Sequence, residues 1–82
     1  MANAKVTLPA ELARLLHFQL EISIDQSNLG RTDRIIARRY FLRREPQADI
    51  GAAIHYDRSA VSRRLPKITE EIVRTAQIIF PE

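Results

Sequence analysis

The sequence QADIGAAIHYDRSAVSRRLPK, at residues 47–67, has the pattern of two short helices joined by a tight turn. The first helix is predicted over about residues 47–54, where apolar residues recur at helical spacing. These apolar residues are Ile50, Ala53 and Ile54. The stripe stops at His55, and Asp57 has the acceptor side chain that favours the N-cap of a following helix. We therefore predict a helix-turn-helix over residues 47–65.

The second helix of this motif has an apolar face and a polar face. Val61 and Leu65 lie four residues apart, so they share the side that can pack against the first helix. The polar side carries Ser59, Ser62 and Arg63. A helix of this kind can lie in the major groove of DNA, where an arginine pairs with guanine through two hydrogen bonds. We expect these three polar side chains to contact base edges.

Four more side chains of the motif are candidates for contacts with DNA phosphates. Arg58, Arg64 and Lys67 add positive charge beside the base-contacting residues. Gln47 begins the first helix, where its side chain and the backbone N–H groups of the helix N-terminus can bind a phosphate.

The motif resembles the helix-turn-helix of region four of bacterial primary-type sigma factors and of sigma-like regulators from phages and mobile elements. The matching segments are residues 33–36, 39–41, 47–50 and 56–65, and the resemblance covers residues 31–72. It implies a transcription regulator that binds duplex DNA. It also implies a possible second partner, RNA polymerase, which regions of this type touch.

The chain departs from that family at the turn and in the loop before the motif. Gly51 stands where the family usually has alanine, and this glycine costs about 1 kcal/mol of helix stability relative to alanine. His55 stands where the family usually has the turn glycine, and histidine is among the residues that tolerate a left-handed backbone. The preceding loop, LRREPQ, is longer and has no glycine.

The distribution of charge supports the same hypothesis. The whole chain has a net charge of +3, whereas residues 31–67 alone hold ten Lys and Arg residues against four acidic residues, a net charge of +6. The basic excess therefore coincides with the predicted helix-turn-helix, as expected for a protein that binds a polyanion.

Length and composition limit the class of protein. Eighty-two residues predict one domain, with residues 1–6 as a flexible leader. The absence of cysteine excludes disulfides and thiol-bound metals and fits a reducing cytoplasm. The chain has neither a membrane-length apolar run nor the apolar core of a signal peptide, so we expect a cytoplasmic protein.

The N-terminal half predicts a helix that is apolar on two sides. Thr7 is a candidate N-cap, Pro9 suits the first turn, and the helix is expected to run to about Ser23. Its apolar residues are Leu12, Leu15, Leu16, Phe18, Leu20, Ile22 and Ile24. A helix of this kind must bury both sides, which suggests a homodimer.

Two prolines mark the other expected boundaries. Thr32 is a plausible N-cap for a helix over about residues 33–44, and Pro46 ends that segment. Pro66 is expected to kink or break the recognition helix. A C-terminal helix continues over residues 66–80, with an apolar face that can pack within the chain or against a second copy. The expected fold class is all-α.

Two other functions remain open. The chain could be a protein-interaction module that docks on RNA polymerase or on a phage packaging or replication complex. It also loosely resembles the ribbon-helix-helix repressors, in which Lys5 and Thr7 would face DNA from an N-terminal strand. That alternative leaves the helix-turn-helix pattern unexplained.

No pattern in the sequence predicts an enzyme. His17 and His55 have no ligand-spaced partners, so both are expected to be structural. There is no nucleophile motif, no glycine-rich phosphate loop and no acidic cluster for magnesium. We expect neither a metal nor a cofactor.

Overall fold

The computed structural model describes residues 6–82, and every regular element within them is helical. The elements are α1 (Ala10–Ala13), α2 (His17–Gln26), α3 (Arg31–Ala37), the π-helical turn η1 (Arg38–Leu42), α4 (Gln47–Ile54) and α5 (Arg58–Ile79). The expected all-α fold is therefore confirmed. Lys5 and most of the predicted leader lie outside the described residues. In this part of the chain, no helix has both the length and the apolar composition needed to cross a membrane.

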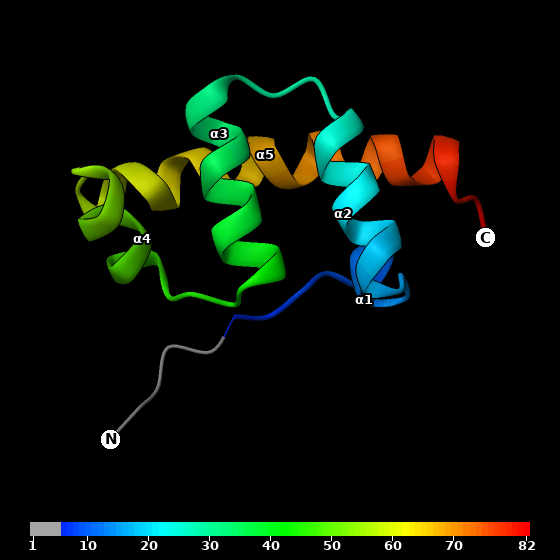
Figure 1. Ribbon diagram of the computed structural model, residues 1–82, viewed down its shortest axis with the longest axis horizontal. Coiled ribbons are helices and arrows are strands. Elements are labelled where there is room, and N and C mark those ends of the chain that lie inside the picture. Colours follow the sequence, from blue (N-terminus) through cyan, green and yellow to red (C-terminus); the bar gives the residue numbers. More distant parts are fainter. Residues whose placement is uncertain (1–5) are drawn as a thin grey trace.

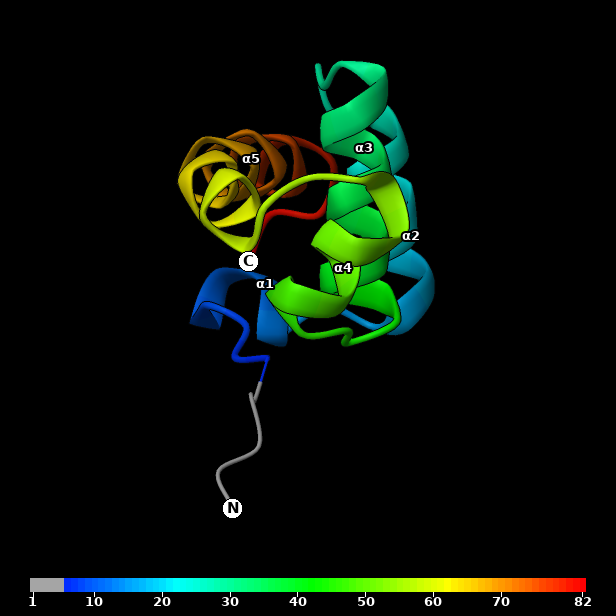
Figure 2. The same ribbon diagram turned by 90° about the vertical axis from the view of Figure 1, so that its left-hand side faces the viewer.

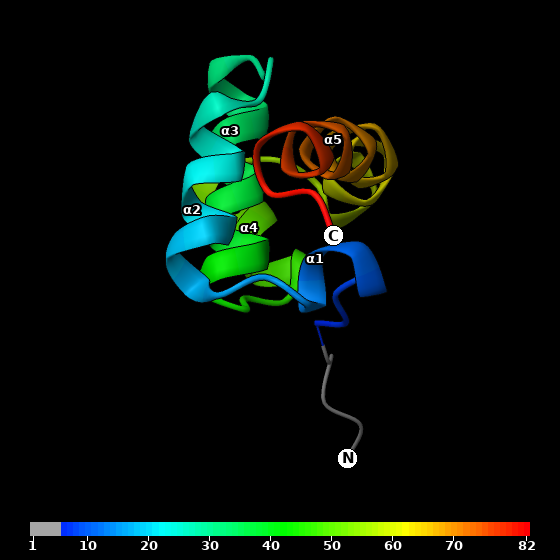
Figure 3. The same cartoon turned by 90° about the vertical axis from the view of Figure 1, so that its right-hand side faces the viewer.

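The helices form two layers. α2 and α3 run side by side, joined by a loop at one end, and α5 crosses behind both of them (Figure 1). Figure 2 shows α5 nearly end-on beside the layer that contains α3, and α4 lies close to the first turns of α5. At the other end of α5, α1 packs near the C-terminus (Figure 3). α5 therefore contacts every other α-helix.

The core lies between these layers and is built largely on one face of α5. The buried residues of α5 are Val61, Leu65, Ile68, Ile72 and Ala76. Leu20, Ile24, Ile36 and Phe41 fill the facing side from α2, α3 and η1. The predicted C-terminal apolar face thus packs within the chain. In α4, Ile50 is buried and Ile54 is partly buried, but Ala53 is exposed, so the predicted stripe was wrong at that position.

The predicted N-terminal helix is broken in two. α1 ends at Ala13, Leu16 is extended (φ −68°, ψ 158°), and α2 begins at His17. The break is stabilised by Gln19, whose side-chain oxygen accepts a hydrogen bond from the Leu16 backbone N–H at 2.9 Å. Two separate helices let α1 lie on α5 while α2 contacts both α3 and α5.

The predicted N-cap at Thr32 was also wrong. Helix α3 begins at Arg31 with Gly30 at the N-cap position, so Thr32 lies in the first turn. The chain then changes to π-helical geometry over η1. Of the kink or break expected at Pro66, a break does not occur, because α5 continues through Pro66 to Ile79. Pro66 is exposed, so water can bond the Ser62 carbonyl that loses its helical partner.

Candidate nucleic-acid interface

The turn between α4 and α5 has the geometry of a tight helix-turn-helix. His55 ends α4 in the left-handed conformation (φ 63°, ψ 39°), as the sequence predicts. The Tyr56 backbone N–H then donates a hydrogen bond to the Gly51 carbonyl at 2.8 Å. α5 begins only two residues later, at Arg58. This short connection holds the start of α5 against α4.

Gly51 lies where the turn packs directly on α4. It is buried, and a Cβ placed on it would lie 2.5 Å from the Tyr56 carbonyl oxygen. That separation is too short for any side-chain carbon. The glycine at this position therefore has a steric reason.

Asp57 occupies the N-cap position of α5, as predicted, with an extended backbone (φ −67°, ψ 151°). Its carbonyl accepts hydrogen bonds from Ala60 and Val61 at 3.0 and 3.2 Å. Its carboxylate makes no capping hydrogen bond to any residue of the described chain. Asp57 therefore marks the helix start through its backbone, and its side chain is exposed.

The three predicted base-contacting residues are all exposed on the first two turns of α5. Val61 and Leu65 are buried behind them. Successive residues of a helix are rotated by about 100°, so Ser59 and Arg63 share the outermost stripe and Ser62 lies to one side of it. The arrangement presents two hydroxyls and one guanidinium on a rigid helix.

The predicted phosphate-contacting residues have different environments. Arg58 and Lys67 are exposed and, like Arg63, make no ion pair with any residue from 6 to 82. Gln47 is the first residue of α4 and is half-buried. These three side chains remain compatible with the predicted role.

The Arg64 side chain interacts with other residues of the chain. Its Nη1 donates a hydrogen bond to Asp33 Oδ1 of α3 at 2.7 Å, and its guanidinium carbon lies 5.4 Å from the centre of the Tyr56 ring. The hydrogen bond and the negative charge of Asp33 raise the pKa of Arg64 above its ordinary value. The sequence missed Asp33 as a partner, because no local pattern links residues that are 31 positions apart. It also missed Tyr56, which lies in the turn eight positions before Arg64.

The four arginines within residues 34–43 all bond to other parts of the chain. Arg38 pairs with Glu21 and Asp25 at 3.1 and 2.9 Å. Arg39 and Arg43 share Glu45, at 2.9 and 3.2 Å. Arg34 donates to the carbonyls of Asp25, Ser27 and Leu29. The uncompensated positive charge of the basic segment therefore includes three residues on the first half of α5: Arg58, Arg63 and Lys67.

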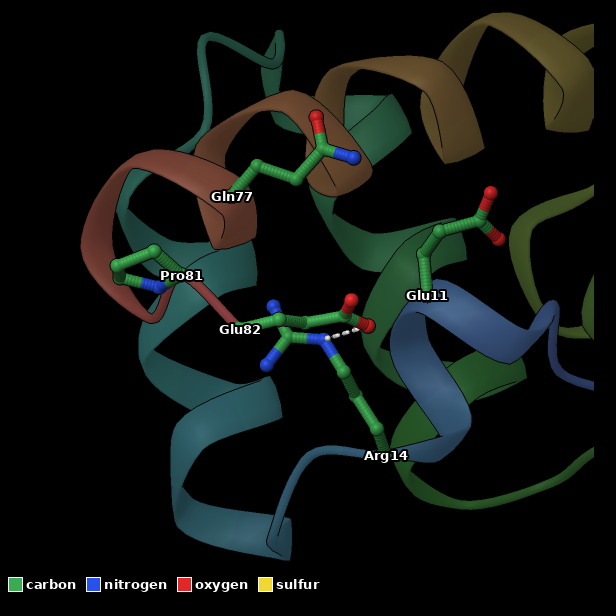
Figure 4. Close-up of a pocket in the computed structure, with 5 residues that line it drawn as sticks. All are labelled: Glu11, Arg14, Gln77, Pro81 and Glu82. Carbon is green, nitrogen blue, oxygen red and sulfur yellow. Dashed lines mark ion pairs between the residues drawn. The ribbon is translucent and has the colours of Figure 1, made fainter.

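A separate surface hollow of about 300 Å³ lies between α1 and the C-terminus. Figure 4 shows Arg14 reaching Glu82 across this hollow, which Glu11, Gln77 and Pro81 also line. Arg14 Nε pairs with the Glu82 carboxylate at 3.4 Å, and its guanidinium donates to the Phe80 carbonyl. These contacts fasten the chain end to α1. Among residues 6–82, no group of His, Asp or Glu side chains is arranged to hold a metal ion.

Comparisons with protein families, with curated proteins and with solved structures found no match to this chain.

Proposed function

We propose that this protein is a small transcription regulator that binds duplex DNA sequence-specifically, with the first turns of α5 in the major groove. One observation carries the proposal: Ser59 and Arg63 are exposed on a helix whose opposite face is buried. Such a helix can enter the groove without disturbing the core. Arg63 has no competing ion pair among residues 6–82, so its guanidinium is available to a guanine.

The electrostatics support the same proposal. Arg58, Arg63 and Lys67 place three exposed cations within the first ten residues of α5. Cations near the groove lower the free energy of binding by releasing counterions from DNA. For a regulator of this class we expect a specific dissociation constant on the order of 10⁻⁸ to 10⁻¹¹ M. Non-specific DNA should bind on the order of 10⁻⁴ to 10⁻⁶ M.

We further propose that the regulator works in the cytoplasm as a homodimer on a two-fold-related site. The support for a dimer is a set of apolar side chains that are exposed at the start of α2 and near the end of α5. Leu16 is 61 % exposed, Phe18 55 % and Ile78 76 %. Apolar side chains left exposed in this way are available for contact with a second copy of the chain. A symmetric dimer would require an inverted repeat in the DNA.

The test compares two arginine variants on a selected duplex by fluorescence anisotropy. Arg63→Ala is expected to lose about 1–3 kcal/mol of binding free energy and to relax the preference at one base pair. Arg74→Ala is the matched control, since Arg74 is also exposed on α5 but lies eleven residues, or about 16 Å, further along the helix. Equal losses in both variants would show general charge attraction and would contradict the proposal.

The same exposed apolar surface favours a second candidate function, a module that docks on RNA polymerase or on a packaging or replication complex. The sigma-like resemblance supports this alternative. It predicts that Ile78→Ala abolishes function while Ser59→Ala and Arg63→Ala do not. The ribbon-helix-helix alternative has less support, because it gives no role to the contact of α4 with α5.

A further inference from the structure

Arg64 lies next to Arg63 in the sequence but on a different side of α5. A rotation of about 100° separates the two side chains, so Arg64 lies on the flank of the helix that faces α3. There it meets the Asp33 carboxylate at 2.7 Å and lies over the Tyr56 ring at 5.4 Å. One side chain therefore links α3, the turn and α5.

This link differs in kind from the packing that surrounds it. Val61 and Leu65 attach α5 to the core by apolar contact, which is strong but not directional. A hydrogen bond has a preferred distance and angle, so it resists rotation of the helix about its own axis. Within residues 6–82, Arg64–Asp33 is the one side-chain hydrogen bond between α3 and α5.

We propose that Arg64 is a positioning residue, which fixes the rotation of α5 so that Ser59 and Arg63 face the bases, and that it does not contact phosphate. This inference rests on the proposed DNA binding. The charge of Arg64 is already matched by Asp33. Moving the guanidinium onto a phosphate would leave the Asp33 carboxylate uncompensated beside DNA, where it would repel the backbone.

Two substitutions distinguish the roles because they change the net charge in opposite directions. Arg64→Gln removes a positive charge, whereas Asp33→Asn removes a negative charge. If Arg64 contacts phosphate, the first variant weakens binding and the second leaves it unchanged or strengthens it. If Arg64 positions the helix, both variants lower the ratio of specific to non-specific affinity.

The experiment measures dissociation constants for a selected duplex and an unrelated duplex at several salt concentrations, with circular dichroism as a check of folding. For a partly exposed pair we expect each single variant to lose up to about fivefold in specificity. The double variant should lose no more than either single variant, because both remove the same contact. Arg74→Gln is the control, since Arg74 pairs with Glu71 of its own helix and links no other element.

The slope of log K against log salt gives a second readout. Each phosphate contact adds about 0.9 to the slope, so a positioning residue leaves the slope unchanged. A smaller slope in Arg64→Gln, or unchanged specificity in both variants, would overturn the positioning role. If the positioning role is overturned but Arg63→Ala still weakens specific binding in those titrations, the proposed DNA binding is unaffected. A wild-type protein that prefers no duplex would overturn both.

Discussion

The backbone of α4 and the following turn touch at Gly51 and Tyr56, where a Cβ on the glycine would lie 2.5 Å from the tyrosine carbonyl oxygen. The same two residues share a hydrogen bond, since the Tyr56 N–H donates to the Gly51 carbonyl at 2.8 Å. The angle at which α5 leaves the turn therefore depends on the absence of a side chain at residue 51.

Gly51→Ala should destabilise the protein although alanine is the better helix former. Helix propensity alone predicts a gain of about 1 kcal/mol. We expect the clash with Tyr56 to reverse that gain, because overpacking a filled site costs about 1–3 kcal/mol. Urea unfolding measures the difference. Ala52→Gly, at an exposed position of the same helix, is the control and should lose about 1 kcal/mol by propensity alone. A raised midpoint for Gly51→Ala would refute the steric argument.

His55→Gly should stabilise the fold. His55 has a left-handed backbone (φ 63°), which is unfavourable by roughly 1–2 kcal/mol for a residue with a Cβ. Glycine removes this strain but gains freedom in the unfolded chain, so we expect a net gain of about 0.5–1 kcal/mol. Thermal unfolding tests this, with His55→Asn expected to be nearly neutral and His55→Val clearly destabilising. A lower melting temperature for the glycine variant would show that the imidazole makes a stabilising contact.

The helix-turn-helix could be predicted from sequence because its signals are local. The spacing of Ile50 and Ile54 indicates α4, His55 tolerates the left-handed turn, and Asp57 marks the start of α5. Each of these features depends on residues within one or two helical turns. The candidate surface residues Ser59 and Arg63 follow from the same local periodicity, which fixes the exposed side once Val61 and Leu65 are buried.

Features that depend on tertiary contacts could not be predicted. The break before α2 depends on Gln19, whose side chain caps the new helix. It also depends on the core, because α1 and α2 pack against it in different directions. Pro66 is tolerated because it lies on the side of α5 that faces water. The partner of Arg64 is on another helix, so sequence alone gave Arg64 the same expected role as Lys67.

Ile72→Ala should destabilise the protein strongly, whereas Ile78→Ala should not. Ile72 has no exposed surface, and truncating a buried isoleucine leaves a cavity that costs about 2–5 kcal/mol. Ile78 lies on the same helix but is 76 % exposed, so its truncation should change stability by less than about 0.5 kcal/mol. Denaturant unfolding at low protein concentration compares the two variants. Low concentration favours the monomer, so a loss for Ile78→Ala as large as that for Ile72→Ala would show that Ile78 packs within the chain and would contradict its exposure.

Lys67→Ala should weaken binding to all duplexes about equally. Lys67 is exposed, and we propose that it contacts a phosphate rather than a base. Losing one such contact should reduce the slope of log K against log salt by about 0.9. Arg58→Ala should behave in the same way. A change in base preference without a change in slope would instead indicate that Lys67 contacts a base edge.

The central claim, that α5 presents a base-contacting surface, is tested most directly by selecting duplexes from a random pool with the wild-type protein and with Arg63→Ala. We predict that the wild-type protein enriches one short motif, arranged as an inverted repeat, and that Arg63→Ala relaxes the preference at one base pair of each half-site. Salt-sensitive binding without an enriched motif, or the same motif at undiminished strength from both proteins, would contradict the claim.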